Sequence, residues 1–129
     1  MEYGFWVPFS GGFDQAVARV TEELQKEGFG ILTEIDVKAT LKKKIDVERR
    51  PYKILGACNP QLANRALQAV PDIGLLLPCN VVVRENDDGG IDVGFLDPGM
   101  MSQMVAGDIE AIASDARARL ERVAAALGG

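Results

Sequence analysis

The chain contains no histidine, and it has only two cysteines among its 129 residues. Without histidine it lacks the commonest metal ligand and the side chain that most often acts as a general base near neutral pH. The sequence also lacks the glycine loops of nucleotide-binding proteins, a nucleophile elbow and a zinc-hydrolase motif. Hydrolytic and dinucleotide-dependent functions are therefore without support, and we expect no dedicated metal site.

Long hydrophobic runs are absent as well, since each apolar stretch falls far below the ~20 residues that span a bilayer. The formal net charge is −5, which disfavours nucleic acid and anionic membranes as partners. The first residues carry an acid and no basic segment, so they do not resemble a signal peptide. We expect a cytoplasmic protein in which residues 1–129 form a single domain and both cysteines are thiols at rest.

Hydrophobic spacing predicts five strands and four helices. The pattern alternates in the strands and repeats every three or four residues in the helices. A helix from Phe13 should end near Gly28, because glycine accepts the left-handed conformation found at helix ends. The expected strands are 3–9, 29–36, 52–58, 79–85 and 91–96. The expected helices are 13–28, 37–45, 60–69 and about 108–127.

This order favours an α+β fold, β-α-β-(short α)-β-α-β-β-α, with a mostly antiparallel five-stranded sheet and the helices packed on one face. The other face is expected to be too apolar to stay wet. The residues assigned to it are Trp6, Leu32, Leu55, Val82 and Leu96. A contiguous apolar face usually marks an interface, and two-fold pairing is the commonest assembly. We therefore expect a homodimer.

The strongest candidate site lies where the third strand ends at Cys58 and the fourth begins at Cys79. If these strands pair antiparallel, the two thiols meet at one end of the sheet, directly opposite each other or one pair apart. Asn59 and Pro60 follow Cys58 as a cap and a first helical residue. The exposed amides of this helix start favour a Cys58 thiolate. Alternatively, both cysteines are simply small buried apolar residues.

Three further features are candidates near this site. Asn59 and Pro60 could hold an anion at the helix start, with help from Lys44 or Lys53. Asp97 with Pro98 repeats the cap-and-proline signal after the last strand. The methionines that follow could bind monovalent copper, but filling gaps in the core is the use that the sequence favours for them.

Several motifs follow one another in the chain: GACNP, an alanine-rich helix, IGLLLPCNVVV, an acidic glycine turn and the closing DP. In this order they resemble the domain-of-unknown-function family 302, over roughly residues 3–125. The resemblance implies a fold similar to that of the TATA-binding protein and a small dimer, but no assigned activity. The matching residues are Lys44, Gly56, Cys58, Asn59, Pro60, Gly74, Pro78, Cys79, Asp97 and Pro98. One departure is Asp46, where the resemblance implies glycine.

Two functions remain open. The first is a dimeric binding module that holds a small anionic or apolar ligand near Lys44, Cys58, Asn59, Pro60, Cys79 and Asp97. The second is a thiol-based redox or soft-metal protein that uses Cys58 and Cys79. The sequence indicates neither a cofactor nor a reaction.

Overall fold

The structure is a computed structural model that describes residues 2–105 and 107–128. Its strands are β1 (Gly4–Phe9), β2 (Gly30–Asp36), β3 (Tyr52–Cys58), β4 (Cys79–Glu85) and β5 (Ile91–Leu96). Its helices are α1 (Phe13–Lys26), α2 (Val37–Ile45), α3 (Pro60–Ala69), the 3-10 helix η1 (Pro71–Leu76), α4 (Gly99–Met104) and α5 (Glu110–Gly128). The predicted order is confirmed, and α4 is an addition within the methionine-rich turn.

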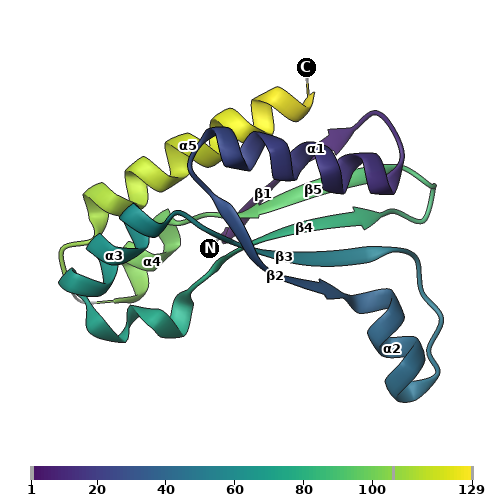
Figure 1. Ribbon diagram of the computed structural model, residues 1–129, viewed down its shortest axis with the longest axis horizontal. Coiled ribbons are helices and arrows are strands. Elements are labelled where there is room, and N and C mark those ends of the chain that lie inside the picture. The colour runs from purple at the N-terminus through teal and green to yellow at the C-terminus, as the bar shows by residue number, and fades with distance from the viewer. Residues whose placement is uncertain (1, 106, 129) are drawn as a thin grey trace.

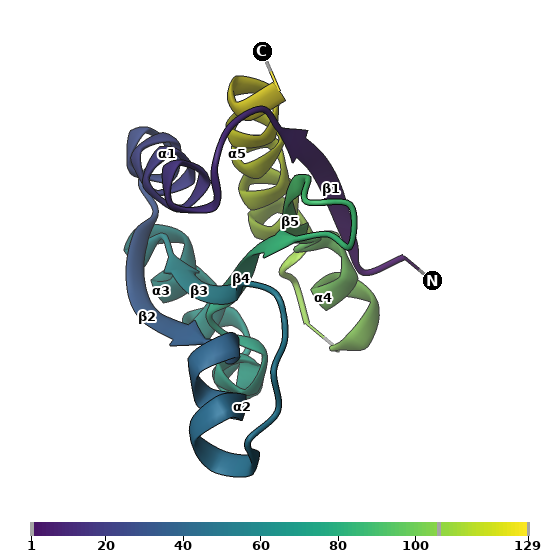
Figure 2. The ribbon, with the colours of Figure 1, turned by 90° about the vertical axis from the view of Figure 1, so that its right-hand side faces the viewer.

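The five strands form one antiparallel sheet in the order β1-β5-β4-β3-β2. The helices α1 and α5 lie side by side on one face of it (Figures 1 and 2). The predicted α+β class and antiparallel sheet are therefore confirmed. The end of α1 also agrees with expectation: Gly28 has a φ of 85°, and the amide of Phe29 donates to the Leu24 carbonyl at 2.9 Å.

Apolar side chains gather in two cores. The larger core fills the space between the sheet and the helices α1 and α5, with fully buried residues such as Val20, Val83 and Leu120. The smaller core lies beyond one end of the strands, where α3, η1 and α4 meet the first part of α5 (Figure 1). Its buried members are Ala66, Ile73, Cys79, Met101 and Ile109. The candidate site belongs to this second core.

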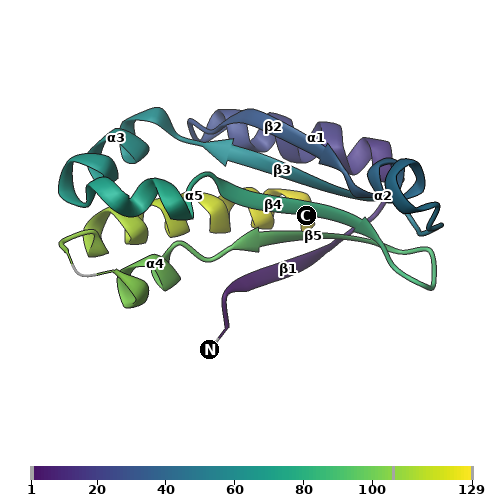
Figure 3. The same ribbon diagram turned by 90° about the horizontal axis from the view of Figure 1, so that it is seen from below.

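No helix crosses the opposite face of the sheet in the described chain, as the view from below shows (Figure 3). A row of paired residues runs across this open face from strand to strand: Ile35, Ile54, Val82, Gly94 and Trp6. Ile35 and Trp6, at the ends of the row, are 47% and 44% exposed. Trp6 lies against Gly94, and the Arg84 guanidinium stacks 3.8 Å from the centre of its ring.

Leu55 was predicted for the open face, and that prediction is wrong. It pairs with Val81 and is 1% exposed in the main core, under the helices. Side chains alternate across a strand, so its neighbour Ile54 occupies the open face instead. β3 is apolar on both faces near this point, and hydrophobic spacing therefore does not show which residue faces the helices.

Helix α2 projects from the body at the end of β2 and contains no buried residue (Figure 1). Asp36 caps its start, accepting a hydrogen bond from the Ala39 amide at 2.9 Å. Asp46 ends it with a φ of 54°, the left-handed conformation that glycine adopts most readily. The position where the resemblance implies glycine is thus one that favours it. No helix in the described chain is both long and apolar enough to cross a membrane.

Candidate functional site

The second core contains an apolar pocket of about 50 Å³ at the end of the sheet. Its walls come from the ends of β3 and β4 and from α3, η1, α4 and α5. The lining residues are Phe29, Ala57, Cys58, Asn59, Leu62, Ala63, Ala66, Ile73, Leu77, Pro78, Cys79, Pro98, Met101, Ile109, Ile112, Ala113 and Ala116. Asn59 is the one amide among these hydrocarbon and sulfur side chains. Such a wall favours an apolar molecule over water, which needs polar partners.

The two cysteines lie at this end of the sheet, and both line the pocket. Cys79 pairs with Ala57, so it stands one position out of register with Cys58. Cys58 is the last residue of β3, and its side chain and that of Cys79 contribute to the wall of the same pocket. Both are free cysteines; Cys58 is half-buried and Cys79 is 8% exposed.

Burial raises the pKa of the Cys58 thiol, and burial together with the charge of Cys58 raises the pKa of Cys79 to about 11. Burial at this position therefore acts against the Cys58 thiolate expected from the helix start, because loss of solvent disfavours the charged form. Thiols of this kind are protonated near neutral pH and react slowly. The geometry agrees with the use of both residues as small apolar side chains.

The raised pKa of Cys79 predicts a loss of stability in alkaline solution. In the unfolded chain this thiol ionises near its ordinary pKa of 9.0, whereas in the folded protein it holds its proton to about pH 11. The unfolded state therefore binds fewer protons between these two values, and the free energy of unfolding should fall as the pH rises through them. The contribution is about 2–3 kcal/mol, fully present below pH 9 and lost by pH 11.

Urea denaturation at pH 8, 9, 10 and 11 measures this loss. The matched control is Cys79→Ala, which removes the thiol and keeps a small apolar side chain. The difference between the two pH profiles isolates Cys79 from the lysines and tyrosines that titrate in the same range. Parallel profiles for the wild-type protein and the variant would contradict the prediction.

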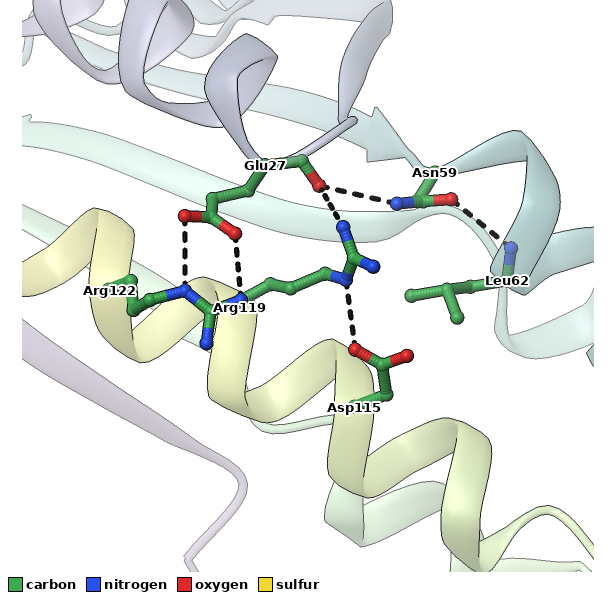
Figure 4. Close-up of polar contacts among 6 residues, drawn as sticks. All are labelled: Glu27, Asn59, Leu62, Asp115, Arg119 and Arg122. Carbon is green, nitrogen blue, oxygen red and sulfur yellow. Dashed lines mark hydrogen bonds and ion pairs between the residues drawn. The ribbon is translucent and has the colours of Figure 1, made fainter.

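Asn59 connects three helices at the edge of the pocket (Figure 4). Its Oδ1 accepts a hydrogen bond from the Leu62 amide at 3.1 Å, which caps α3 as predicted. Its Nδ2 donates to the carbonyl of Glu27 at 3.3 Å, at the end of α1. Arg119 of α5 donates to the same carbonyl at 2.9 Å. Because both ends of its amide are bonded, Asn59 has little polar capacity left for a ligand.

The Glu27 side chain completes this network, which is drawn in Figure 4. Both carboxylate oxygens accept from Arg122, at 2.8 and 3.1 Å. The hydrogen bond from Arg122 holds the pKa of Glu27 below its ordinary value. Arg119 also pairs with Asp115 one turn earlier, at 2.9 Å. The network therefore fixes the start of α3 against α1 and α5.

Asp97 lies at the same end of the sheet, but its carboxylate is engaged by the protein. It accepts from the Gly99 amide at 2.8 Å and also pairs with Arg117 of α5. The guanidinium of Arg117 pairs with Glu121 as well, at 2.6 Å. Asp97 therefore joins α4 to α5, and its neighbour Pro98 lines the pocket.

The structure does not bring Lys44 to this site. β2 runs from Gly30, which pairs with Cys58, to Asp36, which precedes α2. Lys44 is therefore exposed at the far end of the sheet (Figure 1). Lys53 is also distant from the pocket and pairs with Glu34 at 2.8 Å. The anion site expected from Asn59, Pro60 and either lysine is not assembled, and Pro60 serves as the first residue of α3.

Sequence reasoning missed most of the pocket wall. Ile73 lies on η1, a segment expected to be irregular, and Met101 lies on the unpredicted α4. The small residues Ala113 and Ala116 face the pocket from α5, where large residues would fill it. The sequence did contain a signal for this wall, namely the short apolar segments on either side of Cys79. Hydrophobic spacing alone does not show that such segments meet to form a pocket.

A family model for the domain of unknown function DUF302 matches residues 5–127. The chain is similar to the crystal structure of an uncharacterized conserved DUF302 protein from Bacillus stearothermophilus. The TM-score is 0.86 at 33% identity, over 98% of this chain and 97% of that one. An uncharacterized protein of Aquifex aeolicus (strain VF5) is 31% identical over 52 residues, which are 40% of this chain and 36% of that protein. The chain therefore belongs to the DUF302 family.

Proposed function

We propose that this protein is a binding module for a small apolar molecule, or for the apolar end of a longer one, in the pocket beside Cys58 and Cys79. The observation that carries the proposal is the composition of the pocket wall, in which every lining side chain but Asn59 is hydrocarbon or sulfur. The volume of about 50 Å³ is several times the ~10–15 Å³ that one water requires. The pocket thus has room for a few heavy atoms.

Charge supports an apolar ligand over an anionic one. Lys44 and Lys53 lie far from the pocket, and Asp97 is an acid already paired with Arg117. The helix start at Asn59 is capped by its own side chain. An anion would thus lose water at this site without gaining a cation, which makes its transfer unfavourable.

Xenon is a suitable probe, since it is a single apolar atom, fits a pocket of about 50 Å³ and is taken up by apolar protein cavities. We expect a titration followed by ¹H–¹⁵N NMR to shift amides of α3, η1 and α5 in a saturable manner. The variant Ala63→Leu enlarges a partly buried wall residue and should abolish these shifts. The control Cys58→Ser should retain them. Absence of saturable shifts in the wild-type protein, or equal shifts in Ala63→Leu, would overturn the proposal.

The thiol function is the second candidate, because both cysteines are free and contribute to the same pocket. Their raised pKa values count against it, because a protonated thiol is a poor nucleophile and metal ligand. Among the residues that the structure describes, no cluster of three or more histidine, cysteine or acidic side chains could hold a metal ion. Treatment with diamide and measurement of the intact mass separates the two functions. A wild-type protein that loses two protons, with Cys58→Ser unchanged, would favour the redox function.

A further inference from the structure

We propose that the outer edge of β2 binds an extended, acidic segment of a partner protein as an additional strand of the sheet. The backbone of the segment would pair with β2, and its acidic side chains would contact the basic helix α2. The proposal concerns one edge of the sheet and is independent of the pocket. It combines an unpaired strand edge with a group of cations that lack acidic partners.

β2 is an edge strand whose backbone is available for pairing. It pairs with β3 on one side, and no further strand lies beyond it in the part of the chain that the structure describes. Alternate residues of an edge strand direct their N–H and C=O groups away from the sheet, where another chain can pair with them. Residues 32–36 of β2 are all exposed. From Thr33 to Asp36 the pairing with β3 is regular, so this stretch can support a further strand.

The opposite edge of the sheet, β1, is less suited to pairing. It contains Pro8, which has no N–H to donate. β2 contains no proline, and its one irregularity lies between Ile31 and Thr33, near the start of the strand. Natural sheets protect their edges with prolines and bulges. The stretch of β2 that leads into α2 is therefore the less protected edge of this sheet.

Two exposed apolar side chains lie along β2. Leu32 is 66% exposed and Ile35 is 47% exposed. An added strand directs successive side chains to opposite faces of the sheet, so apolar residues at every second position can cover Ile35 on the open face. In this mode of recognition the backbone hydrogen bonds supply affinity, and the alternate side chains supply specificity.

Charge indicates the kind of segment that would bind. Residues 37–50, which form α2 and the loop after it, contain six basic and two acidic side chains, a net charge of +4. Lys42 pairs with both acids of this segment, and Arg50 pairs with acids of the β4–β5 hairpin. The remaining cations have no acidic partner within ion-pair distance among the described residues: Lys38, Lys43, Lys44 and Arg49. Such a group favours a partner that carries acidic side chains.

The position of α2 brings these cations to the end of the edge. The helix follows Asp36 directly and projects beyond β2, which lies at the margin of the sheet (Figure 2). A strand added beside β2 therefore ends next to α2. The acids of β2 itself are engaged by the protein, because Glu34 pairs with Lys53 at 2.8 Å and Asp36 caps α2. A segment with alternating apolar residues and an acidic end fits both features.

A fluorescein-labelled peptide, EEEEVTVTV, tests this contact by fluorescence anisotropy. Paired antiparallel to β2, it places its glutamates beside α2 and its alternating residues along the edge. We expect saturable binding whose dissociation constant rises with salt, because the cations are exposed. The peptide KKKKVTVTV should bind at least about tenfold more weakly, because like charges meet. The same loss is expected for EEEEVTVTV with N-methylated valines, which keeps its side chains but lacks the N–H groups.

Variants of the protein locate the contact. Lys43→Glu/Lys44→Glu should weaken binding of EEEEVTVTV at least about tenfold and strengthen binding of KKKKVTVTV. The control Arg65→Glu changes an exposed cation of α3 and should leave both dissociation constants unchanged. Amide exchange followed by ¹H–¹⁵N NMR should slow at least about tenfold for alternate residues of β2 when the peptide binds, and should not change in β1.

Four results would overturn the proposal. Absence of saturable binding, or equal binding of the N-methylated peptide, would contradict strand pairing. Equal effects of Lys43→Glu/Lys44→Glu and Arg65→Glu would contradict the role of α2. Tighter binding of an oligouridine RNA than of EEEEVTVTV would assign the cations to nucleic acid. Protection of β2 amides that depends on protein concentration without peptide would show that a second copy occupies the edge. None of these results affects the xenon titration of the pocket.

Discussion

The variant Gly28→Ala should lose about 2–3 kcal/mol of folding stability. Gly28 has a φ of 85°, a conformation that costs an L-residue about 1–2 kcal/mol. An added Cβ would also lie 2.8 Å from Nδ2 of Asn59, which has little room to move because it is bonded to Glu27 and Leu62. Loss of the cap on α3 adds about 1 kcal/mol. Urea denaturation measures the sum.

Gly30→Ala is the matched control, since nothing lies within 4 Å of a Cβ at that position and its φ is not positive. We expect little change in its unfolding free energy. The double variant Gly28→Ala/Asn59→Ala tests the mechanism, because truncation of Asn59 vacates the space that the new Cβ needs. Its loss should be smaller than the sum of the single losses. Equal losses for Gly28→Ala and Gly30→Ala would refute both the strain and the contact.

The variant Ile73→Ala should lose about 2–5 kcal/mol and enlarge the pocket. Ile73 is 1% exposed and packs η1 into the second core, where it lines the pocket. Because the new space is bounded by hydrocarbon, benzene should restore part of the lost stability. At ten times its dissociation constant, a bound ligand contributes about 1.4 kcal/mol. Thermal unfolding with and without benzene measures this rescue.

Leu75→Ala is a control on the same short helix. Leu75 is 90% exposed, so its truncation should change stability by less than about 0.5 kcal/mol. Benzene should raise the melting temperature of Ile73→Ala more than that of Leu75→Ala. If benzene stabilised both variants equally, the added stability would not come from the enlarged pocket.

Local spacing predicted most elements of this fold because each carries its own signal. The segment 52–58 was expected as a strand and 60–69 as a helix, and β3 and α3 have these bounds. Two helix starts were also expected from their caps: Asp36 caps α2 and Asn59 caps α3, and both accept the predicted hydrogen bonds. The short helices η1 and α4 carry weaker signals, because one or two turns do not establish a period.

The site was harder to predict because it depends on which segments meet. Pairing of β3 with β4 placed Cys58 and Cys79 at one end of the sheet, as their sequence positions indicated. β2 runs away from Cys58, so Lys44 lies at the opposite end of the sheet. The residues near Lys44 carry no pattern that predicts the direction of β2. The pKa of Cys58 also depends on tertiary packing. The helix start was expected to lower this pKa, but packing covers the thiol and burial raises it.

The stacking of Arg84 on Trp6 gives this chain a built-in spectroscopic reporter. The sequence contains one tryptophan, and its ring lies on the open face of the sheet against Gly94. The fluorescence of Trp6 should therefore change when another molecule covers that face. Because Trp6 does not line the pocket, the same signal should respond little to benzene.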